Sequence, residues 1–124
     1  MVTTTQTQRT DQSAIAVKFV NGTEVYNERG DHIGEIDDVM IDKRSGKVVY
    51  AIMSFGGFLG IGEKYHPLPW QVLTYDTKRS GYVVNMDDAQ LKKAPYYSRE
   101  ELSDNDLLWR EKVFTHYKMP PYWA

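Results

Sequence analysis

Apolar residues between about position 14 and position 97 come in short runs that glycine, proline and aspartate clusters separate. This spacing is typical of β-strands rather than helices. The pattern therefore divides the chain into a disordered tail at residues 1–13, a β domain at 14–97, and a helical and aromatic end at 98–124. Six strands are predicted, at Thr23–Tyr26, Ile33–Ile41, Lys47–Phe55, Glu63–Leu68, Trp70–Tyr75 and Tyr82–Met86.

Two irregularities indicate where the predicted sheet bends. The alternation of apolar and polar positions breaks near Asp37 and Asp38, as it does where one extra residue forms a β-bulge. Pro67 and Pro69 cannot donate the backbone hydrogen bonds of a central strand, so they place their strand at an edge, a bulge or a corner. A sheet that coils back on itself as a small barrel provides such places.

The predicted strand at residues 47–55 is apolar on both faces. A small barrel needs apolar side chains only on its inward face, and a β domain of this size buries only about two-thirds of its unfolded surface, which leaves it marginally stable by itself. We therefore expect the helical end of the chain, or a second copy, to cover the outside of this strand. A helix is predicted at 104–117, with Ser103 or Asp104 as its N-cap. Its apolar face consists of Trp109, Val113, Phe114 and Tyr117.

Composition and motifs argue against catalysis. The chain has no cysteine, which excludes thiolate nucleophiles and sulfur-ligated metals. The glycine-rich stretch at residues 56–64 lacks the spacing of a phosphate-binding loop, and no serine lies in a Gly-x-Ser-x-Gly elbow. His32, His66 and His116 lack metal-ligand spacing; His66 is interpreted as a hydrogen-bonded strand residue near a barrel edge. We expect a protein that is not an enzyme and has no cofactor or metal.

The distribution of charged residues restricts the classes of binding partner that we expect. Among the 124 residues, 15 lysines and arginines nearly balance 17 aspartates and glutamates, which argues against broad nucleic-acid binding. Basic hairpin tips at 43–47 and 78–79 leave contact with RNA or with a membrane surface open as alternatives. Seven carboxylates at 24–42 face one cation, Arg29, and are interpreted as a solvated acidic face that could steer a basic partner.

No apolar stretch reaches the roughly 20 residues of a membrane span, and no secretory signal is recognised, so a cytoplasmic protein is expected. Surplus apolar residues point instead to protein contacts. The loop after Phe55 could present its apolar side chains to a partner or plug the barrel end, and the terminal rings are suited to docking. The candidate interaction residues are Phe58, Leu59, Ile61, Trp109, Tyr117, Tyr122 and Trp123. The predicted function is a protein-interaction module that forms a homodimer.

The string Gly-Gly-Phe-Leu-Gly-Ile-Gly-Glu-Lys at 56–64, followed by Pro-Leu-Pro-Trp at 67–70, closely resembles the PRC-barrel family. The resemblance extends over about residues 20–93 and implies a mainly β fold, a six-stranded barrel used for binding. We expect the C-terminal α-helix to pack on it. The family includes the cytoplasmic part of a photosynthetic reaction-centre subunit and a ribosome maturation factor. Two alternative functions follow: an accessory protein of a photosynthetic or electron-transfer membrane complex, or a ribosome or RNA assembly factor.

Overall fold

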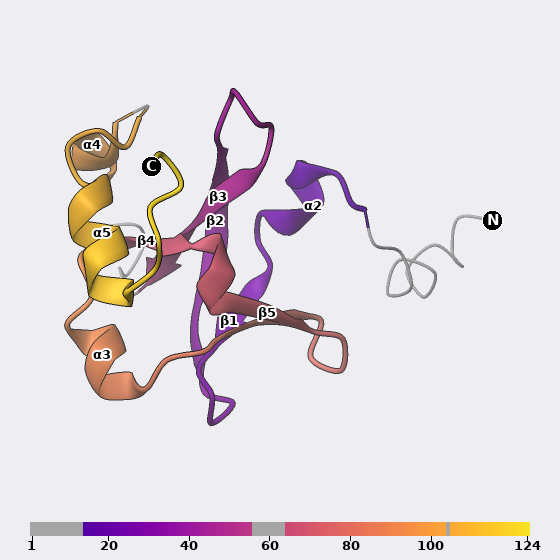
Figure 1. Cartoon of the computed structure of the whole chain (residues 1–124). Coiled ribbons are helices and arrows are strands. Elements are labelled where there is room, and N and C mark those ends of the chain that lie inside the picture. The colour runs from indigo at the N-terminus through magenta and orange to yellow at the C-terminus, as the bar shows by residue number, and fades with distance from the viewer. Residues whose placement is uncertain (1–13, 56–63, 104) are drawn as a thin grey trace.

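Six strands form one curled sheet in the computed structural model, which describes residues 14–55, 64–103 and 105–124. The tail predicted at 1–13 lies outside the described residues. The sheet order is β4-β3-β2-β1-β6-β5, so the mainly β, six-stranded fold is confirmed, with the sheet forming a half-barrel (Figure 1). The strands are β1 (Glu24–Tyr26), β2 (His32–Ile41), β3 (Val48–Phe55), β4 (Lys64–Pro69), β5 (Leu73–Asp76) and β6 (Gly81–Val84).

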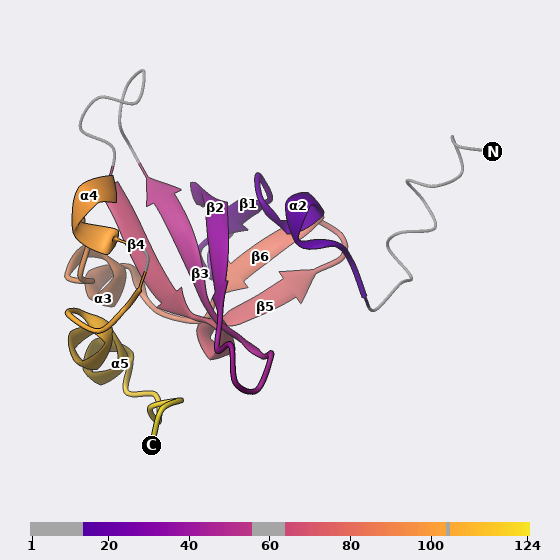
Figure 2. The ribbon, with the colours of Figure 1, turned by 90° about the horizontal axis from the view of Figure 1, so that it is seen from above.

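Short helices cover the sheet. They are α2 (Val17–Val20), α3 (Asp88–Lys92), α4 (Arg99–Leu102) and α5 (Arg110–Tyr117), and a 3-10 turn, η2 (Trp70–Val72), joins β4 to β5. Figures 1 and 2 place α3, α4 and α5 beside β4, and α2 on the other side of the sheet. None of the helices that the structure describes is long and apolar enough to cross a bilayer.

The bends predicted from the sequence are confirmed, whereas one strand is shorter than predicted. The pairing of β2 with β3 shifts between Ile36 and Asp38, where the bulge was expected. β4 lies at an edge of the sheet, which accommodates Pro67 and Pro69. The strand predicted at Trp70–Tyr75 begins only at Leu73, because the chain first turns the corner through η2.

The single helix predicted over residues 104–117 is wrong in its N-terminal part. A separate helix, α4, is capped by Ser98, whose side chain and that of Glu101 form a reciprocal capping box. Ser103 has a positive φ of 52° and hydrogen-bonds to Asn105 in the turn that follows, so it does not cap α5. The other predicted cap, Asp104, lies outside the described residues. α5 starts at Arg110 without a side-chain cap.

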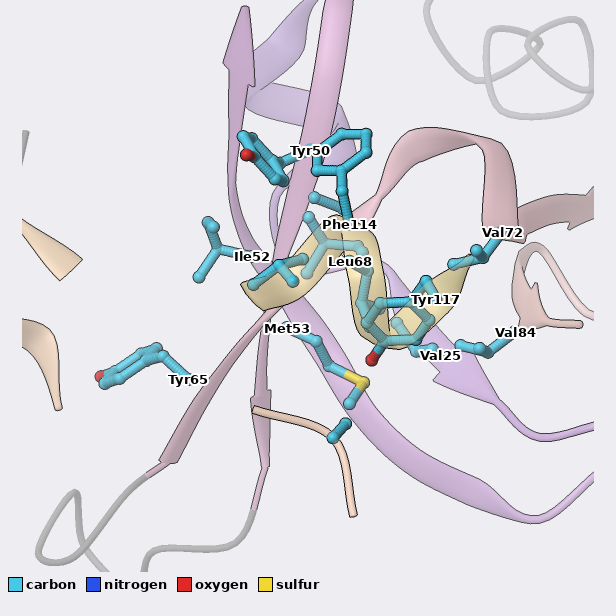
Figure 3. Packing of buried hydrophobic residues seen from close by; sticks show 14 of the residues in the cluster. Val25, Tyr50, Ile52, Met53, Tyr65, Leu68, Val72, Val84, Phe114 and Tyr117 are labelled. Carbon is cyan, nitrogen blue, oxygen red and sulfur yellow. The ribbon is translucent and has the colours of Figure 1, made fainter. Parts of the chain in front are cut away.

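The helical end of the chain covers β3, as the two-sided apolar pattern of this strand predicted. Tyr50 of β3 is fully buried, and its ring packs against Trp109 and Phe114 at centroid distances of 5.1 and 5.5 Å. Figure 3 shows Tyr50 and Phe114 with Leu68 in this cluster. The apolar face predicted for the helix is therefore confirmed; its buried residues are Trp109, Val113, Phe114 and Tyr117.

One buried carboxylate joins the C-terminal segment to the sheet. Asp106 is only 7% exposed, and it accepts hydrogen bonds from the Tyr50 hydroxyl at 2.8 Å and from the Tyr122 hydroxyl at 2.5 Å. Burial beside this carboxylate raises the pKa of both phenols, so they stay protonated and act as donors. Because a buried charge is stable only when it is hydrogen-bonded, Asp106 depends on both tyrosines.

Replacing Asp106 by alanine should lower the free energy of unfolding by about 3 kcal/mol, because the hydroxyls of Tyr50 and Tyr122 then lose their shared carboxylate acceptor. Tyr122→Phe removes one of the two bonds and should cost about half as much. Urea denaturation measures both effects. The matched control is Glu111→Ala on the exposed side of α5, which should change stability by less than about 0.5 kcal/mol. Equal stability of Asp106→Ala and Glu111→Ala would contradict the assignment.

Candidate functional site

A pocket of about 500 Å³ lies between the β1–β2 hairpin, the adjoining ends of β3 and β4, and α3 with the residues after it. Antiparallel pairing of β3 with β4 sets Met53 opposite His66 and Phe55 opposite Lys64, and all four line the pocket. The rest of its apolar wall comes from Ile33, Leu91 and Tyr96. The pocket therefore combines segments that are far apart in the sequence.

The hairpin between β1 and β2 is held by the side chain of Asn27. Its carbonyl oxygen accepts the backbone N–H groups of Arg29 at 3.0 Å and Asp31 at 2.8 Å, while its amide donates to the Asp31 carboxylate. This hydrogen bond, together with Arg29, lowers the pKa of Asp31. Gly30 adopts the positive φ of 92° that the turn requires. Arg29 and Asp31 form an ion pair of 3.1 Å, and both line the pocket.

His66 is the buried titratable group of the pocket. His66 is 8% exposed, and its ring packs against Phe55 and Tyr96 at centroid distances of 6.2 and 5.7 Å. Burial and the nearby Lys64 lower the pKa of His66 to about 4, although a hydrogen bond with the Pro95 backbone opposes the shift. The ring is therefore neutral at neutral pH. Because proline has no N–H, the ring must donate to the Pro95 carbonyl, which leaves its other nitrogen as an acceptor.

Cations outnumber carboxylates in the described lining of the pocket. Arg29, Lys64 and Lys92 contribute positive charge, against the single carboxylate of Asp31, in a chain whose formal net charge is −2. The Lys64 ammonium lies 4.5 Å from the centroid of the Tyr96 ring, a cation–π contact that holds it beside the entrance. The pocket thus offers apolar walls and local positive charge, an arrangement suited to binding an amphipathic anionic group.

The residues proposed from the sequence for protein contacts lie elsewhere. Trp109 and Tyr117 are buried in the chain's own core, and Tyr122 and Trp123 are half-buried beside Phe114. The structure brings these four together, but none of them lines the pocket. The loop residues Phe58, Leu59 and Ile61 lie outside the described residues.

Two carboxylates of the acidic face predicted at residues 24–42, Asp37 and Glu24, are paired with the basic side chains of Arg99 and His32. Arg99, at the start of α4, pairs with Asp37 at 3.5 Å and also donates to the Tyr65 hydroxyl. His32 pairs with Glu24 across the β1–β2 hairpin. Within the part of the chain that the structure describes, no group of three or more histidine or carboxylate side chains is placed to hold a metal ion.

The comparison with protein-family models identifies the family of the chain. A family model described as PRC-barrel domain matches residues 14–91. No curated protein matches the chain. Among solved structures, the chain is similar to a protein from Pseudomonas aeruginosa described as a 16S ribosomal RNA processing protein, RimM, with 16% identity and a TM-score of 0.38. That match covers 65% of this chain and 49% of the other, so it spans about half the length of the solved protein.

The low pKa of His66 predicts a loss of stability in mild acid. The unfolded chain takes up a proton on this histidine near pH 6.5, whereas the folded chain does so only near pH 4. Protonation therefore favours unfolding, and the free energy of unfolding should fall by roughly 3 kcal/mol as the pH drops through this range. NMR titration of the imidazole signals and urea denaturation at each pH measure the effect. A His66 signal that titrates near pH 6.5 would contradict it.

Proposed function

Because this chain belongs to the PRC-barrel family, we propose that it is a cytoplasmic, non-enzymatic protein-interaction module. The proposal is supported above all by the pocket and by two of the rings that line it. Phe55 is 47% exposed and Tyr96 is 51% exposed, so both apolar rings stay accessible at the pocket. Large apolar side chains that stay exposed beside a concave apolar site are typical of a surface that another protein covers.

The polar groups of the pocket favour binding over catalysis. The carboxylate of Asp31 already accepts hydrogen bonds from Asn27 and Arg29, and His66 is neutral and held by the Pro95 carbonyl. A general base and a nucleophile would have to lie within hydrogen-bond reach of each other. No such pair is found among the described lining residues, whose hydrogen bonds instead fix the shape of the pocket.

Self-association and a contact through the loop residues Phe58, Leu59 and Ile61 complete the proposal. Exposed apolar side chains in and before α2 support a contact between copies. Ile15, Val17 and Phe19 are each between 45% and 50% exposed. Apolar side chains that a chain leaves exposed as a group are often covered in a symmetric dimer.

An RNA or ribosome assembly factor is the alternative function. The exposed cations at the β2–β3 hairpin tip, Lys43, Arg44 and Lys47, favour it, since phosphate contacts need accessible positive charge. At the other basic tip, Arg79 is engaged by Asp76 and lies over the Tyr26 ring. No observation on the described residues favours an accessory role in a photosynthetic or electron-transfer complex.

Affinity capture with variant baits tests the interaction function. The full chain should retain specific proteins, identified by mass spectrometry, whose binding falls about tenfold for Phe55→Glu and Leu59→Asp baits, because both changes place charge in an apolar contact. Ile41→Glu is the matched control: Ile41 is 55% exposed but does not line the pocket. Proteins retained equally by all baits would contradict the proposal, and capture that ribonuclease treatment abolishes would favour the RNA alternative.

Sedimentation velocity tests self-association. At micromolar concentration the full chain should sediment as a dimer, because a second copy would bury exposed apolar side chains near α2. Replacing Phe19 by aspartate should shift the equilibrium to the monomer, because the change places a charge among the apolar side chains of the contact. A strictly monomeric wild-type chain across the concentration series would exclude the homodimer.

A further inference from the structure

The positive charge of the pocket lining favours an acidic partner. Lys64 and Lys92 are exposed and line the pocket, while the nearby Arg29 and Asp31 neutralise each other in an ion pair. The described lining is thus positive, although the whole chain is negative. An acidic segment would be attracted to this place and repelled by much of the remaining surface, which gives orientation and specificity more than affinity.

The size of the pocket favours a ligand that inserts one large side chain, which we call the anchor. Its volume of about 500 Å³ falls within the range of roughly 300 to 1,000 Å³ that is usual for ligand pockets. Ile33, Met53 and Leu91 contribute apolar wall, and the rings of Phe55 and Tyr96 line the same pocket but stay half-exposed. Because part of each ring remains open to solvent, a peptide that continues past its anchor can cover both rings, whereas a small molecule that the pocket encloses would not.

The buried His66 favours a ligand whose anchoring side chain ends in a hydrogen-bond donor. His66 donates one ring nitrogen to the Pro95 carbonyl, so the other nitrogen of its neutral ring can only accept. A tyrosine hydroxyl or a tryptophan indole N–H supplies the donor, whereas phenylalanine would cover the acceptor without satisfying it. An unsatisfied buried acceptor disfavours binding.

We infer that this pocket binds an acidic peptide segment of a protein partner through an anchoring tyrosine or tryptophan side chain. The inference builds on the proposed interaction function and specifies the partner at the same site. Lys64 and Lys92 attract the flanking carboxylates, Phe55 and Tyr96 flank the anchor, and His66 accepts its donor.

Three capped pentapeptides test this assignment on the full chain: Glu-Asp-Tyr-Glu-Asp, Glu-Asp-Phe-Glu-Asp and Lys-Lys-Tyr-Lys-Lys. Calorimetry should show binding of the acidic tyrosine peptide, about tenfold weaker binding of the phenylalanine peptide, and none of the basic peptide. Methyl NMR locates the site, because Met53 lines the pocket. Its signal should shift with the acidic tyrosine peptide while the other described methionines, Met40, Met86 and Met119, do not shift.

Two variants separate the contributions of charge and hydrogen bonding. The double change Lys64→Glu with Lys92→Glu should weaken binding at least about tenfold, whereas the matched change Lys43→Glu with Lys47→Glu at the distant hairpin should have no effect. His66→Phe should remove the preference for tyrosine over phenylalanine. Should His66→Phe not fold, the comparison of the two acidic peptides on the wild-type chain still decides, since it needs no substitution.

Equal affinity for the tyrosine and phenylalanine peptides, an unmoved Met53 signal, or binding of the basic peptide would overturn the inference. The capture experiment separates this failure from that of the proposed function. If Phe55→Glu loses identified protein partners while acidic peptides fail to bind, the interaction function stands and only the partner's chemistry is wrong. If neither proteins nor peptides bind, both proposals fail.

Discussion

The burial of Tyr50 under the C-terminal helix, completed by the Asp106 carboxylate, is the constraint on which the rest of the structure depends. A curled six-stranded sheet with a strand that is apolar on both faces would expose that strand to water unless another element covered it. The rings of Trp109 and Phe114 supply the cover. Asp106 then ties Tyr50 to Tyr122, so the final residues belong to the fold and do not form a free arm.

The same arrangement shapes the pocket. To reach the outside of β3, the chain leaves β6, forms α3, and returns along the edge of β4, where Tyr97 pairs with Tyr65 through backbone hydrogen bonds. This return path brings Leu91 and Tyr96 to the pocket wall. The same chain path therefore covers the core and completes the wall of the pocket.

Features that depend on neighbouring residues could be predicted from the sequence, whereas contacts between residues far apart in the chain could not. The bulge at Asp37 and Asp38 and the edge position of the proline-containing strand follow from backbone rules, and they were predicted correctly. In contrast, no local pattern identifies the hydrogen bond between Tyr50 and Asp106, because the two residues are 56 positions apart in the sequence. The pocket escaped detection for the same reason: no local pattern relates Arg29 to Tyr96.

The floor of the pocket is continuous with the hydrophobic core. Met53 is 4% exposed, belongs to the core cluster and also lines the pocket. Gly34 lets β2 approach it closely: a Cβ there would lie 2.8 Å from Met53 Cγ and 2.5 Å from the Ser54 carbonyl oxygen. Because Met53 is fixed by the sheet register and by core packing, the floor of the pocket needs no ordering before a ligand could contact it, which favours affinity. The position of this floor is therefore determined by the same strand pairing that determines the fold.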